Sequence, residues 1–331
     1  MTTAMPAETQ DQDTHGPRRV CVLANRHLLG WQVEALERLV ATTDVEIPLV
    51  VVNEATAVAD DGFSEGASAR GAAAYDNPRG IGRAELELFF ELLRTEGVYT
   101  FVLAEKKLAW MLRGETPALM RRHPVDEVAV LEDAERVACQ PVPVEGEWCD
   151  LPPSVVDRIA AETDVAIRFG FSLLTGRILA EPEYGVLSFH PADIRRYRGI
   201  GPAQPFLDGD DRAGATLQQL TDTVDGGNVV LIESVDISDA YTLDAIRHRV
   251  NQLQAEMLAT GVQRLQDPEF EPEPPSQLGD YLSVTARQSP AFAGKVLAKN
   301  VLGRIRGAVA SRPALRAASE RLPTGIVSEK R

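Results

Sequence analysis

The sequence predicts an α/β fold in which helices flank a mostly parallel sheet, with a helical tail at the C-terminus. Short apolar runs without alternation recur along the 331 residues, as is typical of strands that are covered on both faces. Helical patterns separate these runs, and parallel strands require such crossovers. With 44% hydrophobic residues, the chain is long enough for one large or two modest domains.

The N-terminal part opens with a strand, helix, strand unit. We expect a strand at 19–24, a helix through 31–40 and a second strand at 47–52. The turn between the first strand and the helix, 25–30, reads Asn-Arg-His-Leu-Leu-Gly and lacks the G-x-G-x-x-G of dinucleotide-binding sites. The unit therefore supports the α/β class but does not indicate a nicotinamide or flavin cofactor.

The α/β alternation continues through the rest of the chain. The expected elements are a helix at 84–93, strands at 99–103, 128–131 and 136–139, a helix at 152–162, strands at 164–168 and 228–237, and a helix that begins at Thr242. Two segments have no periodicity and are rich in small or polar residues, so we predict a disordered leader at 1–17 and a flexible insertion at 59–82.

Three polar residues follow or interrupt apolar strands in the middle of the chain. Ser188 and His190 lie two positions apart after the run that ends at Leu187, so they share one face if the strand continues. Asp225 lies at a Gly-rich turn before another strand. Histidine exchanges protons near neutral pH, and a neighbouring aspartate orients it or keeps it protonated. Because ligands collect at strand ends in open α/β sheets, a site is expected here.

This part of the chain carries an ordered set of short motifs. In order, they are His190, Arg198-Gly199, Pro202, Gly209-Asp210, Gly214-Ala-Thr216 and Asp225-Gly-Gly227. The pattern resembles that of the formyltransferases that take a one-carbon unit from 10-formyltetrahydrofolate, firmly over residues 155–240 and by architecture over 18–154. The resemblance implies a Rossmann-like catalytic domain at 18–263 and 10-formyltetrahydrofolate as co-substrate, with no metal.

The resemblance also implies roles for individual residues. A neutral primary amine would attack the formyl carbon, His190 would polarise the formyl oxygen, and Asp225 would position the histidine and assist proton transfer. Ser188 would be the third catalytic position. The residues expected to bind the co-substrate are Phe169, Gly170, Phe171, Arg198, Gly199 and Gly227. From the residues alone, Arg198 is equally consistent with an anchor that holds its loop to a carboxylate.

Ser188 departs from the family pattern, which has asparagine at this position. A hydroxyl can donate to an oxyanion, but it is shorter than an amide. This leaves two alternatives open: a catalytically silent homologue that binds folate or a partner, and a formyltetrahydrofolate hydrolase that uses water as acceptor. Methionyl-tRNA is disfavoured as acceptor because the residues after 263 show almost no strand pattern for a tRNA-binding barrel. A small amine remains, with an amino sugar on a nucleotide carrier preferred.

Charge is distributed unevenly. The chain carries −15 at pH 7, yet 284–331 holds ten Lys or Arg against two Glu. Residues 264–283 read as an acidic, Pro-rich linker, and beyond it Leu297, Val301, Ile305 and Val309 form an apolar stripe bordered by basic residues. This basic helix is consistent with packing on the acidic body or on a partner subunit, which we favour, and with contact to RNA or an anionic membrane. Nucleic acid is disfavoured overall, and a homodimer is left open.

Composition excludes several other classes. No apolar stretch is long enough to cross a bilayer, and the polar start of the chain lacks the apolar core of a secretory signal. The three cysteines are odd in number and widely spaced, so no disulfide framework or zinc site is expected. These observations predict a cytoplasmic, acidic protein.

Overall fold

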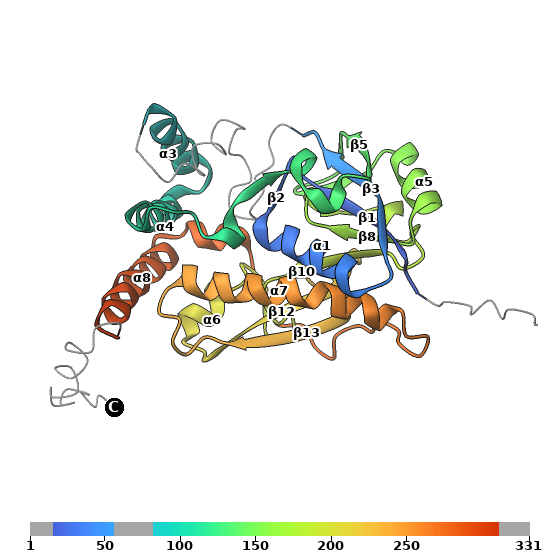
Figure 1. Cartoon of the computed structure of the whole chain (residues 1–331). Helices are drawn as coiled ribbons and strands as arrows, with labels where there is room; N and C mark the ends of the chain where they lie inside the picture. The colour runs from blue at the N-terminus through green and yellow to red at the C-terminus, as the bar shows by residue number, and fades with distance from the viewer. Residues whose placement is uncertain (1–15, 56–81, 311–331) are drawn as a thin grey trace, which may run out of the picture.

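The computed structural model describes residues 16–55 and 82–310, and its centre is a seven-stranded sheet (Figure 1). In spatial order the strands are β13 (Asn228–Asp236), β12 (Arg212–Gln219), β10 (Val186–His190), β8 (Val165–Arg168), β1 (Arg19–Ala24), β3 (Glu46–Asn53) and β5 (Glu135–Cys139). The five strands from β10 to β5 are parallel, while β12 is antiparallel to both β10 and β13. The predicted fold class is confirmed.

Helices, minor strands and 3₁₀ turns make up the other elements of the described residues. The helices are α1 (Gly30–Thr42), α3 (Arg83–Thr95), α4 (Thr100–Arg113), α5 (Pro153–Glu162), α6 (Ala203–Asp208), α7 (Leu243–Leu265) and α8 (Pro290–Ala310). The minor strands are β2 (His27–Leu29) with β4 (Arg122–Pro124), β6 (Val142–Pro143) with β7 (Trp148–Asp150) and β9 (Leu173–Leu174), and β11 (Tyr197–Gly199) with β14 (Asp280–Leu282). The 3₁₀ turns η1 (Gly97–Tyr99) and η6 (Val284–Gln288) contribute Tyr99 and Arg287 to the cavity described below.

The sheet is covered on both faces, which explains why its strands are continuous apolar runs. In β1, Val20 and Val22 pack in the core with residues of α1 and α7, whereas Cys21 and Leu23 pack with residues of α5. All four side chains are fully buried. Burial of a valine or leucine contributes about 1.5 to 3 kcal/mol, so both layers stabilise the strand at the centre of the sheet.

Two of the predicted strands are wrong. Residues 99–103 form the end of η1 and the first turn of α4, and 128–131 hold the 3₁₀ turn η4 (Ala129–Leu131) and the residue before it. In α4 the apolar run continues as Ala109 and Trp110, so the buried positions follow helical spacing over three turns. Packing of this longer stripe overrides the strand preference of the local residues. The other predicted strands and helices are present, and the leader and insertion lie almost wholly outside the described residues.

Residues 264–283, predicted to be a linker, lie along the edge of the sheet domain. The Val229 amide donates to the Glu273 carbonyl at 2.7 Å, and the Arg264 guanidinium lies 5.7 Å from the centre of the Phe270 ring. Further along, β14 pairs in parallel with β11. The chain after α7 therefore returns to the body before η6 begins.

A buried ion pair then fastens η6 to the end of α3. Arg287 donates to both carboxylate oxygens of Glu96, at 2.8 and 2.7 Å, and the two side chains are only 6% and 3% exposed. The guanidinium also lies 5.6 Å from the centre of the Tyr99 ring. Two parallel bonds to one carboxylate fix the direction of both side chains. The pair therefore determines where the C-terminal helix begins.

We predict that Arg287→Met lowers the free energy of unfolding by about 3 to 5 kcal/mol, because it leaves the Glu96 carboxylate buried without its cation. The double variant Glu96→Leu/Arg287→Met should be much closer to the native protein, since neither charge is then buried. Urea unfolding of the native chain, both single variants and the double variant measures this. If the losses of unfolding free energy in the two single variants simply added in the double variant, the two side chains would not be coupled as a buried ion pair.

Helix α8 is present as predicted and packs on the body, but not mainly through its apolar stripe. The buried positions are Ala293, Val296, Asn300 and Gly303, whereas Val301 and Ile305 are 47% and 58% exposed. Asn300 accepts a bond from the Leu243 amide at 2.9 Å and donates to Glu105 at 3.0 Å. Small and hydrogen-bonding residues thus form much of the contact together with Val296, while Val301 and Ile305 of the apolar stripe face solvent and Leu297 is partly buried against the core.

Two glycines of α8 provide a matched test of this contact. A Cβ atom at Gly303 would lie 1.7 Å from the Tyr241 carbonyl oxygen, whereas at Gly294 it would meet nothing within 4 Å. Gly303→Ala should lower stability by about 1 to 3 kcal/mol through overpacking. Gly294→Ala should raise it by up to about 1 kcal/mol through helix propensity. Thermal or urea unfolding compares them, and equal effects would show that α8 does not pack on Tyr241.

Candidate active site

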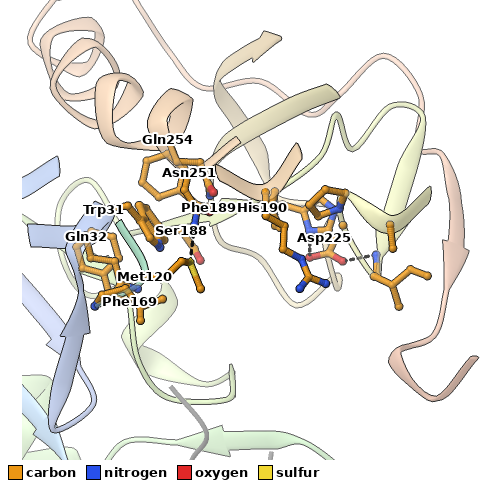
Figure 2. Close-up of a pocket in the computed structure, with 18 of the residues that line it drawn as sticks. Trp31, Gln32, Met120, Phe169, Ser188, Phe189, His190, Asp225, Asn251 and Gln254 are labelled. Atoms are coloured by element: carbon orange, nitrogen blue, oxygen red, sulfur yellow. Dashed lines mark hydrogen bonds and ion pairs between the residues drawn. The ribbon is translucent and has the colours of Figure 1, made fainter. Parts of the chain in front are cut away.

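The candidate site lies at the end of β10, where the strand carries two polar side chains on one face. Ser188 and His190 alternate with Phe189, as β geometry requires, and are 2% and 3% exposed. The strand continues through His190, so the expected shared face is present. Both residues and Asp225 line one cavity of about 300 Å³ (Figure 2). The structure therefore brings the three predicted catalytic residues together.

His190 is held at both ring nitrogens. Its Nδ1 lies 3.1 Å from Oδ1 of Asp225, and its Nε2 lies 3.2 Å from the carbonyl oxygen of Tyr197. Both neighbours are hydrogen-bond acceptors. Asp225 therefore orients the ring through Nδ1, and Nε2 faces the Tyr197 carbonyl beside the cavity.

Asp225 is itself positioned by the backbone. It adopts a left-handed conformation, with φ of 47°, which Asp tolerates better than most residues. Its second carboxylate oxygen accepts a bond from the Gly199 amide at 2.9 Å. Burial opposes ionisation of this carboxyl, but the His190 charge, the His190 hydrogen bond and the Gly199 amide together hold its pKa below the usual value. Asp225 is thus a carboxylate at neutral pH.

We predict that Asp225→Asn lowers stability by about 1.5 to 3 kcal/mol at pH 7, because a charge-assisted hydrogen bond is lost. The pKa of Asp225 is depressed in the folded protein, so its contribution is fully present above the unfolded value of about 3.9 and is lost as pH falls through the folded value. The difference between native and variant protein should therefore shrink at acid pH. Urea unfolding at pH 7 and pH 3 tests this, and a difference that grows towards pH 3 would contradict it.

Ser188 is engaged by a cation that the sequence patterns did not single out. Arg168, the last residue of β8, donates from Nε to the Ser188 hydroxyl oxygen at 3.1 Å and from Nη1 to the Ser172 carbonyl at 2.6 Å. The hydroxyl hydrogen of Ser188 is not used by these bonds. A serine that accepts from a guanidinium is a better donor with its own hydrogen. In the sequence, the signal that could have identified Arg168 was a charged residue at the end of a buried apolar strand.

The rest of the cavity comes from segments far apart in the sequence. On one side Trp31 packs edge-on against Phe169 and Phe189, with ring centres 5.6 Å apart in each case. On another side α7 presents Arg247, Asn251 and Gln254. Figure 2 labels Asn251 and Gln254 near Ser188. Arg287 and Phe292, at the start of the C-terminal helical region, also line it. The spacing 247, 251, 254 places the three polar residues on one helix face.

The residues expected to bind the co-substrate separate into two groups. Phe169 and Gly199 line the cavity, whereas Gly170, Phe171 and Gly227 are not among the described residues that line it. The amides of Phe169 and Gly170 donate to the Leu23 carbonyl at 2.9 and 2.8 Å. Phe171 packs on the opposite face of the sheet, and its amide donates to Asn25 at 3.2 Å. In this conformation these amides form hydrogen bonds within the fold.

Gly227 and Arg198 hold loops near the site. The Gly227 amide donates to the side chain of Gln218 at 2.9 Å, and a Cβ atom there would meet the Gln219 carbonyl at 2.2 Å. Arg198 also lies outside the cavity lining among the described residues. It donates to the Val224 carbonyl at 2.5 Å, and its guanidinium lies 5.6 Å from the centre of the Tyr281 ring. Arg198 therefore anchors the Asp225 loop, through a carbonyl and not a carboxylate.

Two further features of the described residues bear on ligands and membranes. Between 16–55 and 82–310, no group of three or more His, Cys, Asp or Glu side chains is arranged to hold a metal ion. Across the same residues, helices long and apolar enough to span a membrane are absent.

A comparison with known protein families matches the segment that carries the three site residues. Residues 152–262, which include Ser188, His190 and Asp225, match the family model described as Formyl transferase. The segment that carries the site therefore matches the formyltransferase family, which confirms the resemblance seen in the sequence.

Relatives and solved structures match different parts of the chain. The methionyl-tRNA formyltransferase of Rickettsia typhi is 30% identical over 106 residues, which are 32% of this chain and 35% of that protein. The match thus spans about a third of such relatives. Glycinamide ribonucleotide transformylase 1 from Symbiobacterium toebii aligns with a TM-score of 0.46 at 14% identity, over 81% of this chain and 96% of that one. A formyltetrahydrofolate deformylase from Pseudomonas syringae aligns at 0.45 and 15%, over 80% and 66%.

Proposed function

We propose that this protein transfers a formyl group from 10-formyltetrahydrofolate to a small primary amine. The observation that supports it is the convergence of Ser188, His190 and Asp225 on one cavity, with both His190 nitrogens facing acceptors. These residues lie within the segment that matches the formyltransferase family. The co-substrate would supply an activated formyl carbon, and the residues of the cavity would orient the amine and stabilise developing charge.

His190 and Ser188 are the proposed donors to the formyl oxygen as it becomes negative. In this step the Nε2 hydrogen of His190 leaves the Tyr197 carbonyl and donates to the formyl oxygen instead. Asp225 keeps Nδ1 protonated and holds the ring in place. Ser188 donates its hydroxyl hydrogen while Arg168 holds its oxygen. As the new C–N bond forms, the attacking amine must lose a proton, and the Asp225 carboxylate is the base nearest to His190. As its bond to carbon breaks, the departing folate nitrogen takes up the proton that Asp225 received from the amine.

The polar face of α7 indicates the class of acceptor. Arg247 and Gln254 are 8% and 3% exposed and line the cavity with Asn251. Amides exchange hydrogen bonds with hydroxyl groups, and a guanidinium binds phosphate or carboxylate. Another wall of the cavity is aromatic, formed by Trp31, Phe169 and Phe189, which suits the apolar face of a sugar ring. An amino sugar with an anionic substituent, such as a nucleotide carrier, is the proposed acceptor.

We predict that purified protein mixed with 10-formyltetrahydrofolate and a panel of amino sugars and other primary amines releases tetrahydrofolate, and that His190→Ala lowers kcat by at least about 100-fold. Loss of one oxyanion donor typically costs 100- to 1,000-fold. His248→Ala, which changes an exposed histidine of α7, is the matched control and should leave turnover unchanged. Turnover that survives His190→Ala would refute the proposed role of His190.

The contacts of Ser188 and of the neighbouring amides favour a second function, a catalytically silent binding protein. Ser188 is short, it is already bonded to Arg168, and the amides of residues 169–171 are occupied within the fold. That function predicts folate binding without turnover, and Ser188→Asn would introduce the longer donor of the family pattern. Formylation by the native chain would exclude it. Consumption of 10-formyltetrahydrofolate without any amine would instead indicate hydrolysis.

A further inference from the structure

The helices α4 and α8 leave a large apolar surface exposed at one end of the molecule. They lie together, with α3, away from β3 and β5 (Figure 1). Six large side chains define what we call the α4–α8 surface: Phe101 50%, Leu108 52%, Leu112 81%, Val301 47%, Leu302 57% and Ile305 58% exposed. Single exposed apolar residues are normal, but a group of six on two adjacent helices marks an interaction site.

These side chains adjoin one another because of the contact between the two helices. Glu105 of α4 pairs with Arg304 of α8, so these residues mark the facing sides. At about 100° per residue, Phe101, Leu108 and Leu112 lie just to one side of Glu105, and Val301 and Ile305 lie just to one side of Arg304. The buried residues of each helix lie on the other side. The exposed apolar side chains therefore lie on the outward-facing sides of two adjacent helices.

Basic residues surround the apolar side chains. The helices α4 and α8 contain seven Lys or Arg, in a chain whose net charge is −15. Of these, Lys106 is buried, and Arg113 and Arg304 pair with Asp244 and Glu105, so the exposed basic border consists mainly of Lys295 and Arg306. On α8, Lys295 and Arg306 are exposed and lie next to Leu302 on the helical wheel, at the edge of the apolar arc. An apolar stripe with basic borders is typical of helices that lie in a membrane interface.

We propose that the α4–α8 surface docks on an anionic lipid surface. A second copy of the chain, packed symmetrically through this surface, would bring Lys295 and Arg306 close to the same two cations of its partner. A polyanion without apolar groups would neutralise the basic residues but leave the six apolar side chains in water. Anionic lipid supplies both partners, since headgroups attract the basic border and the acyl boundary accepts the apolar side chains.

Vesicle co-sedimentation tests the proposal with the full chain. The native protein should pellet with vesicles of phosphatidylcholine and phosphatidylglycerol, remain in solution with phosphatidylcholine alone, and be released at 1 M salt. Lys295→Gln/Arg306→Gln should weaken binding by about 25-fold, at about fivefold for each basic residue. Leu302→Glu/Ile305→Glu should abolish it.

Val142→Glu/Val144→Glu is the matched control, because these valines are 49% and 59% exposed and lie in and next to β6. This variant should bind vesicles as the native chain does, and unfolding curves of all variants confirm that they fold. The proposal is overturned if the native protein ignores anionic vesicles, or if Leu302→Glu/Ile305→Glu binds them normally. It is also overturned if light scattering shows a dimer that this variant dissociates, since a second copy then covers the surface.

Discussion

The carboxylate of Asp225 connects the catalytic strand to the rest of the molecule. One oxygen pairs with His190 on β10 and the other accepts the amide of Gly199 on β11. Because β11 pairs with β14, the same carboxylate indirectly positions the chain that returns after α7. An ionised, largely buried group requires partners on every side, so these hydrogen bonds constrain the loop, the histidine and the returning segment together.

From β14 the constraint passes to the C-terminal helix. Directly after it, η6 places Arg287 in its buried pair with Glu96, and α8 begins with Phe292 packed near Tyr99. Arg287 and Phe292 line the same cavity as His190. The tail is thus a wall of the site as well as a helix on the surface of the body. A region that reads as an appendage in the sequence contributes to binding because strand pairing and one ion pair bring it back to the sheet.

The polar side chains of the site differ in how they are supported. His190 and Asp225 hold each other, and Ser188 is held by Arg168, so a charged group orients each proposed donor. The peptide amides of residues 169–171 stabilise the strand ends of the sheet instead of facing the cavity. Catalysis by preorganised donors depends on such support, since groups that need not reorient cost no free energy during the reaction.

Local patterns in the sequence determined the α/β class, most strands and helices, and the three residues that meet at the cavity. Period and motif order are local properties, and a strand that continues through His190 puts Ser188 on the same face. Only the tertiary structure decided which distant side chains join them. The Arg168 bond to Ser188, the polar face of α7, and the tail residues Arg287 and Phe292 depend on contacts across up to about two hundred positions. Helix α8 shows the same dependence on distant contacts. Its apolar stripe was visible in the sequence, but the face that packs on the body includes Asn300 and Gly303 and depends on the shape of the surface beneath the helix.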